Sequence, residues 1–460
     1  MGVIDVLAAI GRLVPSAPRP VRRLPIGRRL VFTLLTAVVF VAMASTPLYG
    51  IETAGRLQLS PIVSVVLAMR WGTLAQLGIG PIVTAGLILQ ILVGAKFIKL
   101  DLTNPEDRKK FTLASKGLAV VFAIVEAAGF VVSNLYWRTI TPSIAIKLIV
   151  FLQLVWGAIL VIMLDEAMQK GWGLGSGVSL FILLGVAQRI FVNLLNPLPV
   201  ELYGVKEIVG IIPYTIASVI DGTFRFDYAF LWRGIHMFPT YLGLITTLVL
   251  IAILSYLQSA RIYVPITSPR LRGIRTRIPL QLLYVTNIPV LLTAILISDI
   301  NLFLSIAANA NPSFAPIANR IRDFLAYPTI FRIMYRPLES AIYIAIFFAL
   351  CIAFGIAWVE IAGLNPEAQA ENLIRSGFEI PGMRRNPRVL ASYLARYIYP
   401  LTVLSSIIVA LIAIVGDIFL CYGTGTGILL AVGIVYNYYQ MLVYEKTLEM
   451  YPALKRLIGE

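Results

Sequence analysis

Residues that bind metals or form disulfides are scarce in this sequence. Its 460 residues include one histidine, His236, and two cysteines, Cys351 and Cys421. No His/Cys spacing typical of a zinc site is present, which excludes a zinc metalloprotease, and no metal or cofactor is expected. Both cysteines lie in or beside apolar runs, so each is predicted to be a small packed hydrophobe, and nothing indicates a disulfide.

Charged side chains are scarce as well. They make up 13% of the sequence, whereas soluble domains contain about 25%. Hydrophobic residues make up 59%, and the mean hydropathy is +0.86. The chain is therefore predicted to be an all-α polytopic membrane protein. Residues 1–29 hold a short amphipathic stretch and a Pro/Arg-rich segment without a small-residue cleavage site, so no removable signal peptide is expected.

Long apolar runs, by contrast, are abundant. A bilayer core about 30 Å thick requires roughly 20 apolar residues of helix. Ten runs qualify and are predicted to be transmembrane helices: 30–49, 78–95, 113–134, 143–164, 177–195, 239–258, 280–298, 338–361, 398–416 and 425–444.

Two further apolar pieces, 57–72 and 203–220, compete with these spans. The first is short and contains Arg70, and the second contains Lys206, Glu207 and an interior proline. Counting either piece as a span would invert every later span, and the positive-inside rule decides the topology. With ten spans and both termini cytoplasmic, most of the 38 basic residues fall on the cytoplasmic side. The two pieces are thus predicted to be external or half-inserted.

Several predicted spans are interrupted by glycine or proline in a pattern that indicates an internal repeat. GIGPIV (78–83) resembles TNIPVL (286–291), and GSGVSLFI (175–182) resembles GTGILLAV (425–432). Both pairs are five spans apart, and because five is odd the two halves would insert with opposite topology. Irregular backbone at membrane depth is tolerated only where it faces protein or water, so these segments are predicted to line a central path.

The side chains of the broken segments indicate what such a path could conduct. Ile79 and Val83 are four residues apart and share a helix face, as do Val178 and Ile182. A path for ions or a small solute would need charged or polar anchors. Aliphatic side chains instead favour a seal that closes by excluding water and discriminates little among whatever passes.

Five segments resemble the SecY family, the protein-conducting channel of the Sec translocon, and they are more similar to its archaeal and eukaryotic members than to its bacterial ones. They are LGIGPIVTAG (77–86), LTNPEDRKKF (102–111), LDEAMQKGWGLGSGVSLFI (164–182), YVTNIPVLL (284–292) and GTGTGILL (423–430). The resemblance implies two five-helix inverted-repeat halves packed like a clamshell. It also implies the central subunit of a passive channel, through which unfolded secretory polypeptides cross and from which membrane segments leave laterally.

The resemblance places a ring of aliphatic residues at the pore. Branched aliphatic side chains can close around an unfolded chain without offering it hydrogen bonds, so they hold ions back while polypeptide slides. The implied ring residues are Ile79, Val83, Val178, Ile182, Leu291 and Leu430.

A plug and a lateral gate are implied as well. Residues 57–72 would form a short helix that blocks the closed channel from outside, and the apolar side chains assigned to it are Ile62, Val65, Val66 and Leu67. The gate would open between spans two and three of one half and seven and eight of the other. Its polar contacts would be Thr84, Glu126 and Asn287, which are unfavourable at membrane depth unless paired.

Two basic cytoplasmic loops, 261–277 and 375–388, are long for simple connections. The resemblance implies that they dock the ribosome, whose RNA phosphates suit clustered arginines. The residues assigned to this role are Arg272, Arg275, Arg277, Arg384 and Arg385, and Arg108 is assigned to the cytoplasmic mouth. The other implied partners are small single-span subunits of the SecE and SecG or Sec-beta kinds, a nascent polypeptide with a signal sequence, and membrane lipids.

The predicted organisation follows from the spans and the resemblance. We expect a multi-pass protein of the cell membrane with both termini cytoplasmic. Its predicted parts are a basic N-terminal segment (1–29), an N-terminal half (30–196), an external loop (197–238), a C-terminal half (239–445) and a cytoplasmic tail (446–460).

Two other classes of protein remain as alternatives. A secondary transporter also uses inverted repeats and broken helices, but it needs a polar substrate site at the midplane. An intramembrane aspartyl protease is the second alternative, because VGD (415–417) resembles one half of such a site, although no matching second motif exists. Apart from Glu126, the acidic residues considered are expected near span ends: Asp165, Glu166, Glu339, Glu360 and Asp417.

Overall fold

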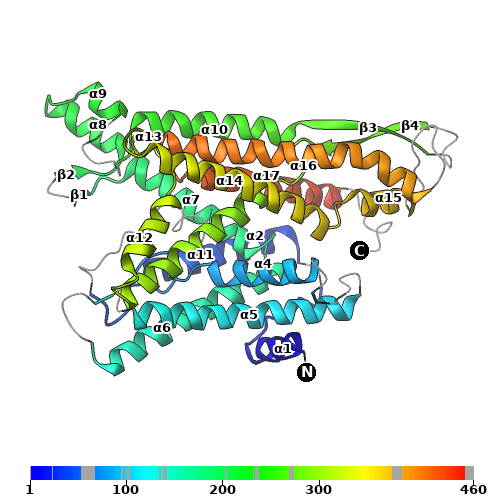
Figure 1. The fold of residues 1–460 in the computed structure, drawn as a ribbon, viewed down its shortest axis with the longest axis horizontal. Helices are drawn as coiled ribbons and strands as arrows, with labels where there is room; N and C mark the ends of the chain where they lie inside the picture. Colours follow the sequence, from blue (N-terminus) through cyan, green and yellow to red (C-terminus); the bar gives the residue numbers. More distant parts are fainter. Residues whose placement is uncertain are drawn as a thin grey trace.

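The computed structural model is a helical protein whose main helices run along one long axis (Figure 1). It describes residues 2–22, 24–52, 68–94, 97–98, 100, 104–133, 136–137, 142–202, 205–231, 233, 238–268, 274–375 and 386–450.

Within these ranges, nine helices are long and apolar enough to cross a membrane. A tenth apolar helix, α4 (Gly80–Gly94), has 15 residues, is about 22 Å long, and falls on the predicted second span. The predicted fold class of ten membrane helices is thus confirmed with α4 included. The nine longer helices are α2 (Ile26–Ser45), α5 (Pro105–Val132), α6 (Ile144–Ala167), α7 (Gly177–Leu195), α10 (Tyr241–Ser259), α11 (Ile288–Ala310), α14 (Pro337–Ile361), α16 (Pro387–Ile418) and α17 (Gly425–Met450).

The remaining elements lie at the ends of the long helices. The N-terminal helix α1 (Val3–Leu13) packs against α5, and the short π-helix η1 (Met168–Trp172) continues α6. The others are β1 (Pro199–Leu202), β2 (Val205–Ile208), α8 (Ile211–Ile220), α9 (Phe226–Leu231), β3 (Arg261–Ser268), β4 (Ile274–Gln281), α12 (Ala315–Phe324), α13 (Ile330–Tyr335) and α15 (Pro366–Arg375).

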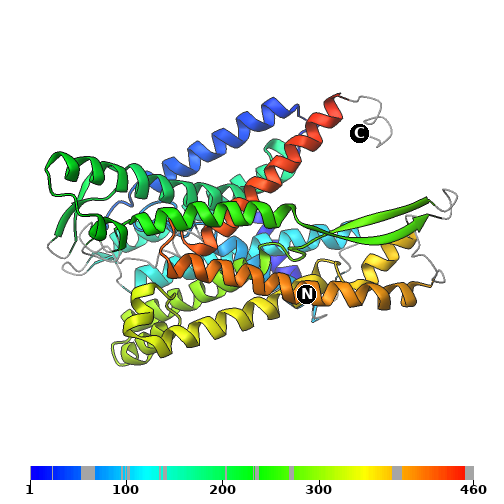
Figure 2. The same ribbon diagram turned by 90° about the horizontal axis from the view of Figure 1, so that it is seen from above.

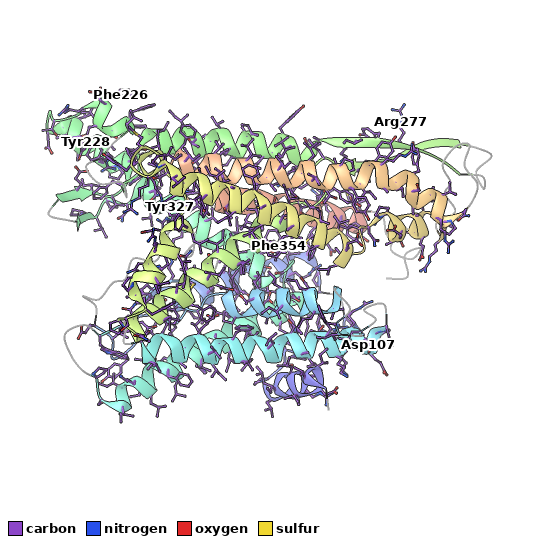
Figure 3. The ribbon with its side chains drawn as sticks, viewed as in Figure 1. Asp107, Phe226, Tyr228, Arg277, Tyr327 and Phe354 are labelled. Carbon is purple, nitrogen blue, oxygen red and sulfur yellow. The ribbon has the colours of Figure 1, made fainter. Side chains whose placement is uncertain are left out.

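The two ends of the molecule differ in character. Figure 3 shows Asp107 and Arg277 at one end of the long axis, and Phe226 and Tyr228 at the other. We call the first the hairpin end, because the antiparallel ribbon β3–β4 extends beyond the helices there (Figure 2). The apolar piece 203–220 folds at the opposite end into β2 and α8, and α8 has only 10 residues, too few to span.

The seventh span differs from its predicted boundaries of 280–298. Its helix, α11, covers Ile288–Ala310, because the preceding apolar residues belong to β4 and to a turn. Pro289 also suits the first turn of this helix, because N–H groups there have no intrahelical acceptor and proline, which has no N–H, therefore sacrifices no hydrogen bond. Apolarity therefore marked this region correctly but could not separate a strand from a helix.

The backbone confirms the repeat that the broken spans predicted. Each of α4, α7, α11 and α17 begins two residues after a residue with positive φ. These residues are Gly78 (φ 55°), Gly175 (φ 69°), Thr286 (φ 54°) and Gly423 (φ 86°). The helix starts also correct the predicted register of the second pair: Gly175-Ser-Gly177 corresponds to Gly423-Thr-Gly425, two residues earlier than the sequence match.

Two glycines allow these helix starts to approach the preceding helix closely. A Cβ atom on Gly177 would lie 2.6 Å from Cα of Asp165, and a Cβ on Gly425 would overlap the carbonyl oxygen of Ala413. Any side chain at either position would push the two helices apart. The glycines therefore set where α7 and α17 begin, and with them the depth of the side chains that follow.

The core lies between the two halves of the chain. We call α2 to α7 the N-terminal half and α10 to α17 the C-terminal half. One apolar cluster combines residues of both, among them Phe130 of α5, Phe181 of α7, Phe347 of α14 and Val409 of α16. The pore candidates must therefore be sought inside this shared cluster.

Replacing either tight glycine by alanine should destabilise the protein. We expect Gly177→Ala and Gly425→Ala each to lower the free energy of unfolding by about 1–3 kcal/mol, the usual effect of overpacking. Thermal unfolding of the purified protein in detergent measures this. Gly27→Ala is the matched control, because a Cβ there meets nothing within 4 Å; equal effects at all three sites would contradict the explanation.

Candidate pore and gate

The six predicted ring residues come from four helix starts. Ile79 immediately precedes α4, whereas the other five lie within the first two turns of α4, α7, α11 and α17. Ile79, Ile182 and Leu430 are buried, with exposed fractions of 0%, 2% and 3%. The remaining three, Val83, Val178 and Leu291, are partly buried and pack against the same apolar cluster. All six thus belong to, or pack against, one apolar cluster, and their role as a ring stays a prediction.

A buried aspartate caps the start of α7. Asp165 is near the C-terminal end of α6 and has an exposed fraction of 5%. Its Oδ1 accepts a hydrogen bond of 3.0 Å from the backbone N–H of Val178, and its Oδ2 accepts one of 2.8 Å from Gln169. The first N–H groups of a helix have no intrahelical partner. Asp165 supplies one in a place that side chains shield from water.

The start of α17 repeats this arrangement. Asp417 lies in the last turn of α16 with an exposed fraction of 4%, and its Oδ1 accepts a hydrogen bond of 2.7 Å from the N–H of Gly425. The sequence predicted Asp165 and Asp417 only as residues near span ends. The signal that could have found their role is an aspartate upstream of each Gly-Ser/Thr-Gly turn.

Two of the residues predicted for a lateral gate lie at a surface between the two halves. We call it the seam: the surface where α4 and α5 contact α11 and α14. Thr84 of α4 donates a hydrogen bond of 2.7 Å to Oδ2 of Asp299 on α11. Glu126 of α5 is buried, and its carboxyl lies close enough to Asp299 for their charges to repel when both are ionised.

Two of the three predicted gate residues therefore lie at the seam, and the third does not contact them. Nδ2 of Asn287 donates a hydrogen bond of 3.0 Å to the carbonyl of Leu429, within the C-terminal half. Asn287 precedes α11, about three helical turns from Asp299. Asp299, which the sequence did not single out, contacts Thr84 at the seam, and the gate role implied for Asn287 stays a prediction.

Small residues keep the seam tight on either side of this polar contact. A Cβ on Gly94 of α4 would overlap the side chain of Ile361 on α14. A Cβ on Gly129 of α5 would lie 3.0 Å from Cδ1 of Ile306 on α11. Among the described residues, the seam thus combines tight apolar contacts with a polar group formed by Thr84, Glu126 and Asp299.

Several predicted site residues lie outside the described residues. These are the plug residues Ile62, Val65, Val66 and Leu67 and the loop residues Arg272, Arg384 and Arg385. Among the others, the backbone of Arg275 lies in β4, Arg277 is exposed on β4, and Arg108 is exposed near the start of α5. The described basic residues assigned to docking therefore belong to the hairpin end.

A second cluster missed by sequence analysis organises the opposite end. Arg233 is 1% exposed, stacks on the ring of Tyr214 at 3.7 Å, and donates to the carbonyls of Ile208 (2.6 Å) and Pro239 (3.1 Å). Burial lowers the pKa of its guanidinium, and the carboxylate of Glu207 opposes this change. One arginine thus connects β2, α8 and the entry to α10.

Comparison with known proteins identifies the fold. A family model described as SecY matches residues 73–439. The chain belongs to the SecY family. Protein translocase subunit SecY of Aeropyrum pernix is 48% identical, with 100% of this chain and 99% of the relative covered, and that of Saccharolobus solfataricus is 45% identical, with both chains covered completely.

Solved structures agree with this SecY-family assignment. A structure described as that of a protein-conducting channel matches with a TM-score of 0.79 at 31% identity, covering 98% of this chain and 99% of the other. Sec61 in the canine ribosome-channel complex from the endoplasmic reticulum matches with a TM-score of 0.77 at 30% identity and the same coverage. The chain is a multi-pass membrane protein of a family of protein translocation channels.

Removing either aspartate cap should weaken the protein, and an amide should largely restore it. Asp165→Ala or Asp417→Ala leaves a buried N–H unpaired, so we expect a loss of about 1–3 kcal/mol in the free energy of unfolding. Asp165→Asn and Asp417→Asn keep an acceptor oxygen and should lose less. Thermal unfolding in detergent compares the two series; asparagine variants as unstable as the alanine variants would refute capping as the role.

Proposed function

We propose that this chain is the central pore-forming subunit of a protein-conducting channel in the cell membrane. Unfolded secretory polypeptides would cross through it, and segments of membrane proteins would leave it sideways into the lipid. The observation that supports this most directly is that six aliphatic side chains at the starts of four broken helices belong to, or pack against, one apolar cluster between the halves. Membership of the SecY family supports the same function.

The chemistry of the six residues suits a seal for polypeptide. Aliphatic side chains present no hydrogen-bonding groups, so an ion entering among them would lose its hydration without replacement. An extended polypeptide can pass because side chains move aside and close again behind it. The positive-φ residue before each helix and the aspartate caps of α7 and α17 hold the ring residues on fixed backbone, so only side chains need to move.

Lateral release needs a boundary that can separate, and we assign this role to the seam. Its contact through Thr84, Glu126 and Asp299 is small compared with the apolar core, and the flanking contacts at Gly94 and Gly129 involve no hydrogen bonds. Separation there would open the pore to lipid without breaking a helix. A hydrophobic signal sequence could replace the apolar contacts that the seam loses.

The hairpin end is our candidate for ribosome docking. The ribbon β3–β4 extends from the membrane helices, and both Arg261 and Arg277 are exposed on it. Figure 3 shows Arg277 on this ribbon. Arginine suits phosphate contacts, and ribosomal RNA is a polyanion. A similar chain, Sec61, is described in a ribosome-channel complex.

Three further parts of the proposal concern topology and partners. Both termini would lie on the cytoplasmic side, and residues 57–72 would act as a plug on the outside. Single-span subunits of the SecE and SecG kinds would pack against the lipid-facing helices.

The pore assignment is tested by crosslinking a ribosome-stalled nascent chain. Single cysteines replace Ile79, Val83, Val178, Ile182, Leu291 or Leu430 in turn. Each should form a crosslink with a cysteine in the translocating segment. Leu148→Cys on α6, whose native side chain is 56% exposed, is the lipid-facing control and should not react. Crosslinks to the control but not to the ring positions would rule out this path.

The seal itself is tested by ion leak. Changing Ile79, Val83, Val178 and Ile182 together to glycine removes the aliphatic side chains that exclude water from the constriction, so ion leak through reconstituted vesicles should rise several-fold. A fourfold alanine variant separates loss of the seal from loss of helix stability, because alanine keeps helix propensity and should still leak. An unchanged leak in both variants would argue strongly against the ring.

Docking is tested by charge reversal on the hairpin. Arg261→Glu with Arg277→Glu should weaken ribosome binding and make it less sensitive to salt, because fewer phosphate contacts then release counterions. Co-sedimentation of vesicles with ribosomes at two salt concentrations measures both effects. Arg225→Glu, an exposed arginine in the segment between α8 and α9 at the opposite end, is the control and should leave binding unchanged.

A further inference from the structure

The repeat assigns two more residues to the pore wall than the six aliphatic ones. Ile79 directly precedes the first residue of α4, and Asn287 directly precedes the first residue of α11. Val178 directly follows the first residue of α7, and Thr426 directly follows the first residue of α17. By position in the repeat, Asn287 thus corresponds to Ile79, and Thr426 corresponds to Val178.

Helix periodicity points to the same two residues independently. Side chains four positions apart in a helix share one face. Asn287 stands four residues before Leu291, and Thr426 stands four residues before Leu430, as Ile79 stands before Val83. The pore wall therefore has eight positions, of which six are aliphatic and two, both in the C-terminal half, are polar.

Both polar side chains keep a buried atom without a partner. Among the described residues, no hydrogen bond reaches Oδ1 of Asn287 or Oγ1 of Thr426, although both atoms are buried. Thr426 as a whole is 0% exposed. A buried polar atom left unpaired costs roughly 1–3 kcal/mol, so such groups in a native structure call for an explanation. Valine at position 426 would have the same shape without this cost.

The two residues lie on opposite sides of the constriction. The helix α11 begins just after the hairpin, so Asn287 lies one turn from Leu291 toward the hairpin end. The helix α17 runs in the opposite direction: the segment before it faces the end away from the hairpin, where the hydroxyl of Tyr422 donates to the carbonyl of Thr240 at the start of α10 (2.8 Å). Thr426 therefore lies one turn from Leu430 toward the opposite end.

We propose that Asn287 and Thr426 are contact sites for the main chain of the translocating polypeptide, one on each side of the aliphatic ring. An extended peptide presents N–H and C=O groups at every residue, whatever its sequence. Oδ1 of Asn287 accepts a hydrogen bond from a passing N–H, and the hydroxyl of Thr426 can donate to a C=O or accept from an N–H. The aliphatic ring itself offers no hydrogen-bonding groups. Contacts at Asn287 and Thr426 therefore shorten the stretch over which the N–H and C=O groups of the translocating peptide lack hydrogen-bond partners.

This inference rests on the proposed function, and Thr426→Val tests it. We expect the variant to have an equal or higher unfolding midpoint, because it removes an unpaired hydroxyl, while a nascent chain becomes protease-protected in vesicles several-fold more slowly. Thr293→Val is the matched control: that hydroxyl is also 0% exposed but donates to the carbonyl of Pro289 at 2.8 Å, so its loss should lower the midpoint. The full-length chain is used throughout.

The possible results separate cleanly. If the unfolding midpoint of Thr426→Val falls as far as that of Thr293→Val, the Thr426 hydroxyl is paired in the folded protein. If Thr426→Val is stable and transports at the normal rate, the polypeptide does not use this hydroxyl. Either result overturns the inference. Asn287→Leu, assayed for transport alone, should also slow it. Absence of any nascent-chain crosslink to the six ring positions would instead overturn the proposed function.

Discussion

Backbone hydrogen bonding at membrane depth is the constraint on which the rest of this structure depends. A helix that starts inside the protein leaves N–H groups that water cannot reach, and they need partners from the chain itself. Asp165 and Asp417 provide these partners for α7 and α17, and tight glycines let the helices come close enough. Helices can therefore begin in the middle of the molecule, and the first turns of four of them can meet there.

The seam is held in a different way from the pore. The pore wall depends on fixed backbone, because Asp165 and Asp417 hydrogen-bond to the first turns of α7 and α17 within their own halves. The seam depends on side chains across the halves: Thr84 donates a hydrogen bond to Asp299, and Glu126 lies near enough to the same carboxyl for their charges to repel when both are ionised. Because the aspartate caps lie inside each half and the Thr84–Asp299 contact lies across the seam, separation at the seam would leave the capped helix starts intact.

Apolar length, broken spans and family resemblance were enough to predict the ten membrane helices and the repeat, while the ring role of the six aliphatic residues stays a prediction. Two kinds of detail were beyond them. Apolarity cannot tell a strand from a helix, so the start of α11 was misplaced, and Asp299, the hydrogen-bond partner of Thr84, was not singled out. Contacts between distant segments, such as Arg233 with Ile208, also leave no local pattern. The repeat was aligned two residues too late in α17, because the sequence GTGTG (423–427) contains Gly-Thr-Gly twice and sequence alone could not tell which copy precedes the helix.

The β3–β4 ribbon has a mechanical consequence for the C-terminal half. Eight residue pairs, from Arg261–Gln281 to Ser268–Ile274, connect the chain leaving α10 to the chain entering α11, and Leu282 adds a hydrogen bond to Ala260 at the base. The ribbon thereby couples α10 and α11 to each other at the hairpin end. A tilt of α11 that widens the seam would therefore move α10 and the ribbon with it. The displacement of the ribbon outside the bilayer would then report on the opening of the seam within it.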